Sequence, residues 1–416
     1  MGDQNKNVPR LRFPGYTDAW VERTFFDNIK NIIDFRGRTP KKLGMNWSDT
    51  GYLALSALNV KNGYIDPEAD AHYGNQELYD TWMTGKELHK NQVLFTTEAP
   101  MGNVAQVPDN KKYILSQRVI AFDVKEDKIA EDFLATILRS PKTFNELSAL
   151  SSGGTAKGVS QKILARMKIV VPNSLDEQIK IGSSLSLFDK IIDLHQEELL
   201  KLKNLKKSYL GKMFPKNGSD IPELRFPGYT DAWVKCELKQ IGEIITGSTP
   251  STSKIENYSE MGSPWVTPTD INTPTISETQ KRLSKAGEMI SRMVPKGTIL
   301  VTSIASIGKN TMLTVRGSFN QQINGVIPNK ENDSYFLLVM SEIWSRKMKY
   351  FASSGTMPIV NKTEFKEMEF YFSKDKIEQT KIGEFFKHLD NLITVNEREL
   401  NKLKELKKSY LKNMFV

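Results

Sequence analysis

The sequence predicts an α+β protein in which two mixed α/β domains, related by pseudo-twofold symmetry, are joined by two long antiparallel helices that resemble a coiled coil. Three observations predict this fold. A chain of 416 residues is long enough for two to three domains. The chain contains the same pattern twice, and each copy ends in a long stretch with a heptad repeat of apolar residues.

The duplication is clearest at the two ends of each copy. The opening motif LRFPGYTDAWV stands at Leu11–Val21 and again, unchanged, at Leu224–Val234. A closing block at Asp176–Phe214 aligns without gaps with Ile377–Phe415. The middles differ much more, which indicates two related tasks with different targets. A duplication that drifted without specialising is the alternative, although drift alone would erode the ends as well.

These blocks divide the chain into four parts. Each divergent middle, taken with its opening motif, is expected to form one domain, and each closing block is expected to form one helix. The predicted boundaries are 1–171 for the first domain, 172–220 for the central helix and linker, 221–372 for the second domain and 373–416 for the C-terminal helix.

The divergent middles combine short strands with helices. Segments that are rich in β-branched and aromatic residues, and bounded by Gly, Pro or Asn, are typical of strands. Such segments predict strands at 92–97, 168–171, 298–303 and 369–372, and intervening helices are expected at 131–150 and 335–351.

The closing blocks carry an apolar seam whose residues recur in alternating steps of four and three. Each seam has a polar residue at the same middle position, His195 in one block and Asn396 in the other. We expect the two helices to pack against each other, with these residues fixing the register. Packing of each helix on its own domain is the alternative. The predicted packing residues are Ile181, Leu185, Phe188, Ile192, His195, Leu199, Leu202, Ile382, Phe386, Leu389, Ile393, Asn396, Leu400 and Leu403.

Composition and charge narrow the function. The net charge of +9 and the pI near 9.2 favour a polyanionic partner such as nucleic acid, although many soluble proteins are mildly basic. No apolar run is long enough for a membrane helix, and no apolar segment follows the N-terminal charges. The single cysteine, Cys236, excludes an intramolecular disulfide and fits a reducing, cytoplasmic location.

Polar and basic residues in the loops of both middles are candidates for DNA contacts. Arg and Lys suit guanine, Asn and Gln suit adenine, and all of them can hold a phosphate. The alternative for any single residue is a loop side chain that faces water. The first copy offers Arg36, Arg38, Thr39, Asn59, Lys61, Thr96, Thr97, Ser116, Gln117, Arg118 and Lys157, and the second offers Ser248, Thr249, Asp270, Asn272, Ser303, Lys309, Asn310, Asn320, Gln321 and Gln322.

Catalytic and metal-binding motifs are missing from the sequence. The four histidines and one cysteine have no metal-ligand spacing, and there is neither a GxxxxGK[ST] loop nor a GxSxG elbow. The NPPY-like motif of amino-methyltransferases and a methyl-donor glycine loop are also missing. We therefore predict no catalytic residue, metal site or cofactor in this chain, which favours a binding module over an enzyme.

The order of these motifs resembles that of the specificity subunit of type I restriction–modification systems. The resemblance covers nearly the whole chain. It depends on the duplicated opening motif, on the turns GRTP and GSTP, and on the helices that start near Glu177-Gln178 and Glu378-Gln379 and end in LKKSYL. A Pro-Pro that often precedes the Glu-Gln in the family is absent, and only Pro172 stands nearby.

The resemblance implies a function and a set of partners. Each middle would be a target-recognition domain that reads one half of a bipartite site in double-stranded DNA. The helices would set the gap and dock two methyltransferase (modification) subunits, which bind S-adenosylmethionine. Restriction (motor) subunits, which use ATP and Mg²⁺, would join the complex in host defence. The alternatives are a stand-alone DNA-modifying enzyme, either a nuclease or a fused methyltransferase, and a tandem protein-binding adaptor.

Overall fold

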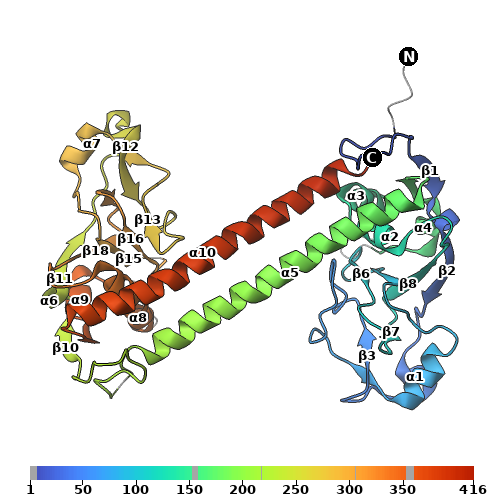
Figure 1. Cartoon of the computed structure of the whole chain (residues 1–416), viewed down its shortest axis with the longest axis horizontal. Coiled ribbons are helices and arrows are strands. Elements are labelled where there is room, and N and C mark those ends of the chain that lie inside the picture. The colour runs from blue at the N-terminus through green and yellow to red at the C-terminus, as the bar shows by residue number, and fades with distance from the viewer. Residues whose placement is uncertain (1–6, 152–157, 217, 305, 353–359) are drawn as a thin grey trace. The chain divides into compact units, whose positions relative to one another are not determined.

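The computed structural model describes residues 7–151, 158–216, 218–304, 306–352 and 360–416. The chain divides into two compact units, Met1–His195 with Leu400–Val416 and Gln196–Glu399, called the first and second unit below. The divisions fall inside the two long helices, α5 (Leu175–Lys212) and α10 (Lys376–Asn413), shown green and red in Figure 1. Each unit therefore contains one divergent middle and a part of both helices. The finer domain boundaries stay a prediction.

The first unit is built on an antiparallel sheet with the strand order β2-β8-β5-β6. The strands are β2 (Ile29–Asp34), β8 (Val119–Val124), β5 (Val93–Thr96) and β6 (Val104–Gln106). All four residues of β5 are buried, because helix α2 (Glu131–Leu138) packs on the face that carries Val93 and Phe95, and a second core covers Leu94 on the other face. This sheet and helix hold the main core of the unit.

A smaller three-stranded sheet extends the first unit. Its order is β4-β3-β7, and β3 runs parallel to β7. Helix α1 packs on β7 and contributes Trp82 to a separate core. The remaining elements of the unit, with the strands of this sheet, are β1 (Val21–Thr24), β3 (Tyr52–Leu55), β4 (Tyr73–Gly74), β7 (Ile114–Leu115), β9 (Lys168–Val171), α1 (Gln76–Met83), α3 (Pro141–Leu150), α4 (Gln161–Arg166) and the 3-10 turns η1 (Phe25–Asn28) and η2 (Pro40–Leu43).

The second unit repeats this framework. Its larger sheet has the order β11-β18-β15-β16-β13, its smaller sheet is β14-β12-β17, and β10 pairs with β19 as β1 pairs with β9. The elements are β10 (Val234–Glu237), β11 (Gly242–Thr246), β12 (Tyr258–Val266), β13 (Thr275–Ile276), β14 (Arg282–Leu283), β15 (Ile299–Thr302), β16 (Asn310–Leu313), β17 (Ser318–Phe319), β18 (Ile323–Pro328), β19 (Glu369–Phe372), α6 (Leu238–Ile241), α7 (Lys285–Ile290), α8 (Ser334–Ala352), α9 (Lys362–Lys366) and η3 (Ile255–Asn257).

The strands predicted near 92–97, 168–171, 298–303 and 369–372 are confirmed as β5, β9, β15 and β19. The helix predicted at 335–351 is confirmed as α8. The helical structure predicted at 131–150 is confirmed, but it forms two helices, α2 and α3, with a break between them. Ser140 caps the second helix by accepting a hydrogen bond from the Thr143 N–H, and Pro141 occupies its first position.

The long helices run antiparallel to each other within each unit. In the first unit the rings of Phe188 and Tyr410 lie 5.3 Å apart, and Asp189 forms an ion pair with Lys407. In the second unit Lys206 lies 2.7 Å from Asp390. The mixed α/β domains and the two long helices of the predicted fold are thereby confirmed.

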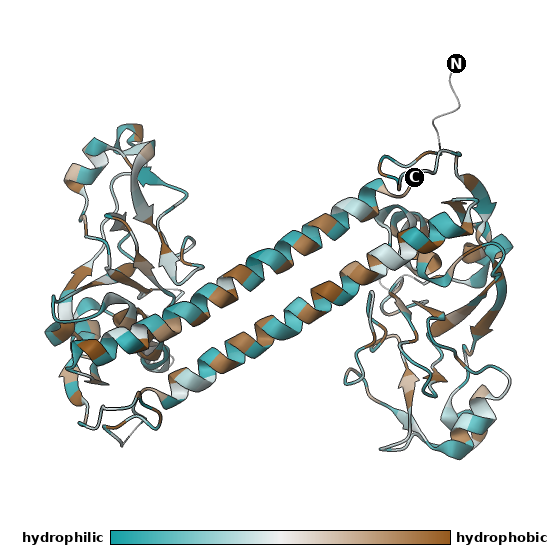
Figure 2. Ribbon diagram, viewed as in Figure 1, coloured by the Kyte–Doolittle hydropathy of each residue, from teal (hydrophilic) through white to brown (hydrophobic). Residues whose placement is uncertain are grey.

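The predicted packing residues of the seam are all buried or half-buried. Figure 2 shows apolar residues alternating with polar ones along both helices. Ile181 and Leu185 join the core of the first unit, and Ile382, Phe386 and Leu389 join that of the second. Packing along the whole seam, including Phe188, Ile192, His195, Leu199, Leu202, Ile393, Asn396, Leu400 and Leu403, stays a prediction. Within the described ranges, no helix combines the length and the apolar character that a membrane span requires.

The opening motif ties the ends of both helices together. In the first unit, Arg12 binds Glu177 at the start of α5, and the Leu11 N–H donates to the Asn413 carbonyl at the end of α10. In the second unit, Arg225 binds Glu378 at the start of α10. There the N–H of Leu224 donates to the carbonyl of Lys212 in α5. We call this arrangement the clasp, and it gives a structural reason for the identity of the duplicated ends.

Candidate nucleic-acid interface

The first unit contains a cavity that gathers five of the predicted contact residues. Its volume is about 320 Å³, and the turn between β7 and β8 forms one wall. The segment after β2 and the loops around β3 supply most of the rest of the lining. Several aromatic side chains lie among the polar ones. The predicted residues that line this cavity are Arg38, Thr39, Ser116, Gln117 and Arg118.

Arg38 is held in place by aromatic rings. Its guanidinium lies 4.9 Å from the ring centre of Phe35 and 5.7 Å from that of Trp82. The same group donates a hydrogen bond of 3.0 Å to the Trp82 carbonyl. Thr39 beside it caps η2 by accepting from the Lys42 N–H. Arg38 is thus a positioned cation at the wall of the cavity.

Arg118 is the more accessible cation of this cavity. About half of its side chain is exposed, and its Nε lies 3.2 Å from Oε1 of Glu98, which is exposed to a similar extent. The backbone of Arg118 is fixed, because its carbonyl accepts hydrogen bonds from the N–H and the hydroxyl of Thr97. The turn is therefore rigid, whereas the side chain is free to exchange its ion pair for another anion or acceptor.

Sequence reasoning missed the aromatic wall of this cavity. The rings of Trp47 and His72 are stacked, with centres 5.8 Å apart and planes inclined by 13°. Nε2 of His72 lies 3.3 Å from Oδ1 of Asp70, and the other carboxylate oxygen, Oδ2, accepts a hydrogen bond from the hydroxyl of Ser56. These residues lie far from the turn in the sequence, so no local pattern pointed to them.

Arg36 and Lys61 lie outside this cavity. Arg36 forms three hydrogen bonds of 2.5 to 3.1 Å to the carboxylate of Asp34 through its guanidinium. Burial raises the pKa of Asp34, but the hydrogen bonds from Arg36 and Gln161 outweigh it, and the pKa is lowered. Arg36 is therefore engaged in a local ion pair. Lys61 is half-buried, and its N–H donates a hydrogen bond to the Tyr64 carbonyl, which closes a turn.

Four predicted contact residues are corrected by their burial, because each is at most 4% exposed and is hydrogen-bonded inside the protein. Asn59 donates to the Ala54 carbonyl and accepts from the Ser56 N–H. These side chains are covered by the protein and hold loops together. The four are Asn59, Thr96, Thr97 and Ser303. Lys157 lies outside the described residues.

A cavity of about 280 Å³ in the second unit brings together Asn272, Lys309 and Asn310. The ammonium of Lys309 lies 3.3 Å from the Pro268 carbonyl, and the Asn310 amide donates to the hydroxyl of Ser345 at 3.1 Å. Asn272 donates to the Thr269 carbonyl at 2.8 Å. Each of these three polar side chains therefore has a hydrogen-bond partner inside the protein.

Three charged residues that line this cavity form a cluster. Lys206 of α5 lies 2.5 Å from Glu342 of α8 and 2.7 Å from Asp390 of α10. Burial lowers the pKa of Lys206, but the two carboxylates outweigh it and raise the pKa above its ordinary value. The hydroxyl of Tyr335 donates to Asp390 at 2.9 Å. We call these four residues the charged cluster, and it joins both helices to the second unit.

Some of the other predicted residues of the second unit are hydrogen-bonded to neighbouring residues, and the rest are exposed. Asp270 accepts from the N–H and hydroxyl of Thr267 and from the Gln280 N–H, so its carboxylate holds this loop together. The hydroxyl of Ser248 accepts from the Arg292 N–H at 2.9 Å. Asn320 donates to the side chain of Gln322 at 3.3 Å, whereas Thr249 and Gln321 are exposed.

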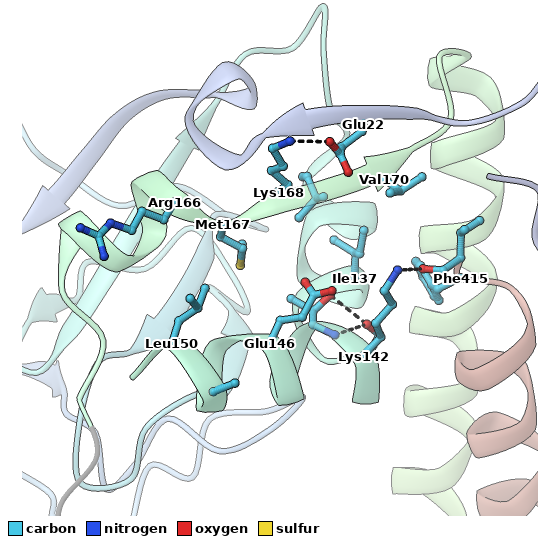
Figure 3. Close-up of a pocket in the computed structure, with 15 residues that line it drawn as sticks. Glu22, Ile137, Lys142, Glu146, Leu150, Arg166, Met167, Lys168, Val170 and Phe415 are labelled. Atoms are coloured by element: carbon cyan, nitrogen blue, oxygen red, sulfur yellow. Dashed lines mark hydrogen bonds and ion pairs between the residues drawn. The ribbon is translucent and has the colours of Figure 1, made fainter. Parts of the chain in front are cut away.

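A further cavity of about 430 Å³ lies in the first unit, between α3, β9 and the C-terminal residues (Figure 3). Two of its lysines are already engaged, since Lys168 lies 2.7 Å from Glu22 and Lys142 donates to the Val416 carbonyl at 2.7 Å. None of the predicted contact residues lines this cavity. Among the described residues, no group of three or more His, Cys, Asp or Glu side chains is placed to hold a metal ion.

Comparison with known proteins decides the family. A model of the "Type I restriction modification DNA specificity domain" matches twice, at residues 26–204 and 230–405. The chain belongs to this family. The two matches cover both divergent middles and most of both long helices, so the duplication is a duplication of this family's domain.

Curated relatives carry corresponding names. The MjaIX specificity subunit of a type I restriction enzyme from Methanocaldococcus jannaschii is 32% identical over 196 residues, which is 44% of each chain. The chain therefore spans less than half of that relative. The MjaVIII specificity subunit from the same organism is 24% identical, with 79% of this chain and 80% of the relative covered.

Solved structures share the fold. A crystal structure of the S subunit of a type I restriction–modification system from M. genitalium has a TM-score of 0.70 at 17% identity. That match covers 98% of this chain and 99% of the other. The chain of a second structure, described as showing complex assembly and conformational transition of the type I system, has a TM-score of 0.51 at 17% identity.

Proposed function

We propose that this chain is the DNA-recognition subunit of a type I restriction–modification complex and that each unit reads one half of a bipartite site. The observation that carries the proposal is the repeated specificity domain, whose two copies share the order of four strands in the larger sheet but differ at matching loop positions, with Arg38 against Ser248 and Ser116 against Asn320. A shared framework with different side chains at matching positions is what two readers of different sequences require. Direct readout needs such side-chain differences at the base edges.

The basic charge supports DNA as the partner. The chain has a net charge of +9, and the cavity of the first unit carries Arg38 and Arg118. Contacts to phosphates supply much of the affinity of such proteins and weaken steeply with salt. We therefore propose that affinity comes largely from lysines and arginines around the cavities, and sequence preference from the residues that line them.

The helices would set the gap between half-sites and dock two methyltransferase subunits. Both helices carry exposed apolar side chains. On α5 the exposed fractions of Leu187 and Leu194 are 57% and 65%, and on α10 those of Leu392 and Val395 are 54% and 51%. Exposed apolar residues on a helix favour a protein partner. Asp189 with Lys407, and Lys206 with Asp390, would keep the helices in one register.

The chemistry would reside in the partners. The methyltransferase subunits would bring S-adenosylmethionine, and the restriction subunits would use ATP and Mg²⁺. This chain would bind DNA, position the partners and take no part in bond-making, in the cytoplasm of the host cell.

The test is a binding and turnover experiment. The chain, purified with its methyltransferase partner, is expected to bind a duplex that carries both half-sites, and the logarithm of affinity should fall linearly with that of salt concentration. Exchange of residues 20–170 for the matching segment of another family member should alter one half-site alone. Methylation or cleavage of DNA by the purified chain without partners would contradict the proposal and favour a stand-alone enzyme. DNA binding that depends on neither the DNA sequence nor the salt concentration would favour a protein-binding adaptor.

A further inference from the structure

One turn is built in the same way in both units. In the first unit, the Ser116 N–H donates to the Leu55 carbonyl at 3.0 Å, and the Val119 N–H donates back to Ser116 at 3.2 Å. In the second unit, the Asn320 N–H donates to the Val266 carbonyl at 2.9 Å. The N–H of Ile323 donates back to Asn320 at 3.1 Å. Each turn therefore leaves the smaller sheet and enters β8 or β18 along the same path.

The last residue of each turn is fixed from a second side. The Arg118 carbonyl accepts from the Thr97 N–H at 2.9 Å and from its hydroxyl at 3.2 Å. The Gln322 carbonyl accepts from the Ser303 N–H at 2.9 Å and from its hydroxyl at 3.1 Å. Arg118 and Gln322 are thus structural equivalents, even though their side chains differ.

The fold depends on the backbone of this position and not on its side chain. The carbonyl carries the bonds that close the turn, while the Arg118 side chain is half-exposed and lies 3.2 Å from a half-exposed Glu98. In the second unit the residue in the place of Glu98 is Ile304, and the Gln322 side chain accepts from Asn320. A carboxylate therefore accompanies the arginine, whereas isoleucine stands at the matching position of the second unit.

We infer that Arg118 and Gln322 occupy one equivalent base-reading position, at which the first unit selects guanine and the second selects adenine. This inference rests on the proposed function. Arginine matches the O6 and N7 acceptors of guanine, and glutamine matches the donor and acceptor of adenine. The cavity beside Arg118 gives a base edge room, and the rigid turn fixes the reach of the side chain. Glu98 orients the guanidinium until DNA replaces it.

The test uses the full chain in cells that contain its methyltransferase partner, with adenine methylation mapped across the genome. Arg118→Gln is expected to change one G·C pair of one half-site to A·T, and Gln322→Arg to make the opposite change in the other half-site. The preference for guanine over adenine at each position should change by roughly tenfold to hundredfold. The gap and all other positions should stay unchanged.

Matched variants separate readout from general charge. Lys111→Gln removes a positive charge from a side chain that is 80% exposed, and Gln280→Arg adds one at an exposed position of the second unit. Both are expected to leave every position of the site unchanged. If Arg118→Gln weakens methylation equally at all sites and changes no base pair of the site, Arg118 binds phosphate and the inference is wrong. If the unaltered chain yields no two-part site, the proposed function itself is wrong.

Discussion

Arg12 binds Glu177 through two parallel hydrogen bonds, Nε to Oε1 at 2.6 Å and Nη2 to Oε2 at 2.8 Å. The carboxylate is 1% exposed, and the indole N–H of Trp20 donates to it at 3.4 Å. The hydrogen bond to Glu177 raises the pKa of Arg12. Arg225 and Glu378 repeat this pair in the second unit. A paired, buried carboxylate therefore anchors the start of each long helix.

Arg12→Met should destabilise the first unit by about 3–5 kcal/mol, because it leaves the buried carboxylate of Glu177 without its cation. Urea unfolding, followed by hydrogen exchange at the start of α5, measures this loss. The control is Arg10→Met, since Arg10 is exposed. Equal stability of the two variants would show that the clasp does not hold the helix.

Two glycines of α5 should respond in opposite directions to alanine. A Cβ at Gly182 would lie 2.6 Å from the backbone nitrogen of Phe133, whereas one at Gly211 would meet nothing within 4 Å. Gly182→Ala should therefore cost roughly 1–3 kcal/mol by forcing α2 away. Gly211→Ala should stabilise the helix by about 1 kcal/mol. Thermal unfolding of both variants tests this, and a loss of stability in both or neither would contradict the packing of α5 on α2.

The charged cluster should make the second unit sensitive to alkaline pH. Burial lowers the pKa of Lys206, but Glu342 and Asp390 raise it overall, and burial together with Asp390 raises the pKa of Tyr335. Because both pKa values are higher in the folded state, their stabilisation is complete below the ordinary values of 10.5 and 10.0. It is lost as pH rises through the folded values. The unfolding free energy of the second unit should fall above about pH 10.

Lys206→Met tests the same cluster by substitution. It leaves the buried carboxylate of Asp390 and the partly exposed carboxylate of Glu342 without their cation, and it should cost about 3–5 kcal/mol at neutral pH. Lys207→Met is the control, because Lys207 lies next to it on α5 and is exposed. The free energy of unfolding should be clearly lower for Lys206→Met than for Lys207→Met. The loss of stability at alkaline pH should also be smaller in Lys206→Met than in the unaltered chain. An unchanged stability of Lys206→Met would mean that the charged cluster does not join α5 to the second unit.

Asn396 is 6% exposed, and its buried Oδ1 has no hydrogen-bond partner among the described residues. Asn396→Leu should raise the melting temperature, because a buried polar atom without a partner costs about 1–3 kcal/mol. Asn391→Leu, at an exposed site of the same helix, should change it little. Calorimetry compares the two. A lower melting temperature for Asn396→Leu would mean that its amide is satisfied in solution and fixes register.

The long helices and the flanking strands could be predicted because they depend on local periodicity. The break at Ser140-Pro141 also had a local signal, a capping serine before a proline, which the apolar pattern across it concealed. The clasp could not be predicted, since Arg12 and Glu177 are 165 residues apart in the sequence. Asn59 looks like a surface loop residue in the sequence, and only the fold shows that it is buried.

The gap between half-sites tests the account most directly. Removal of one heptad from each long helix, residues 196–202 and 397–403, preserves both seams, and adenine methylation is then mapped with the partners present. We predict that both half-site sequences persist and that fewer base pairs separate them. Altered half-site sequences with an unchanged gap would contradict the account.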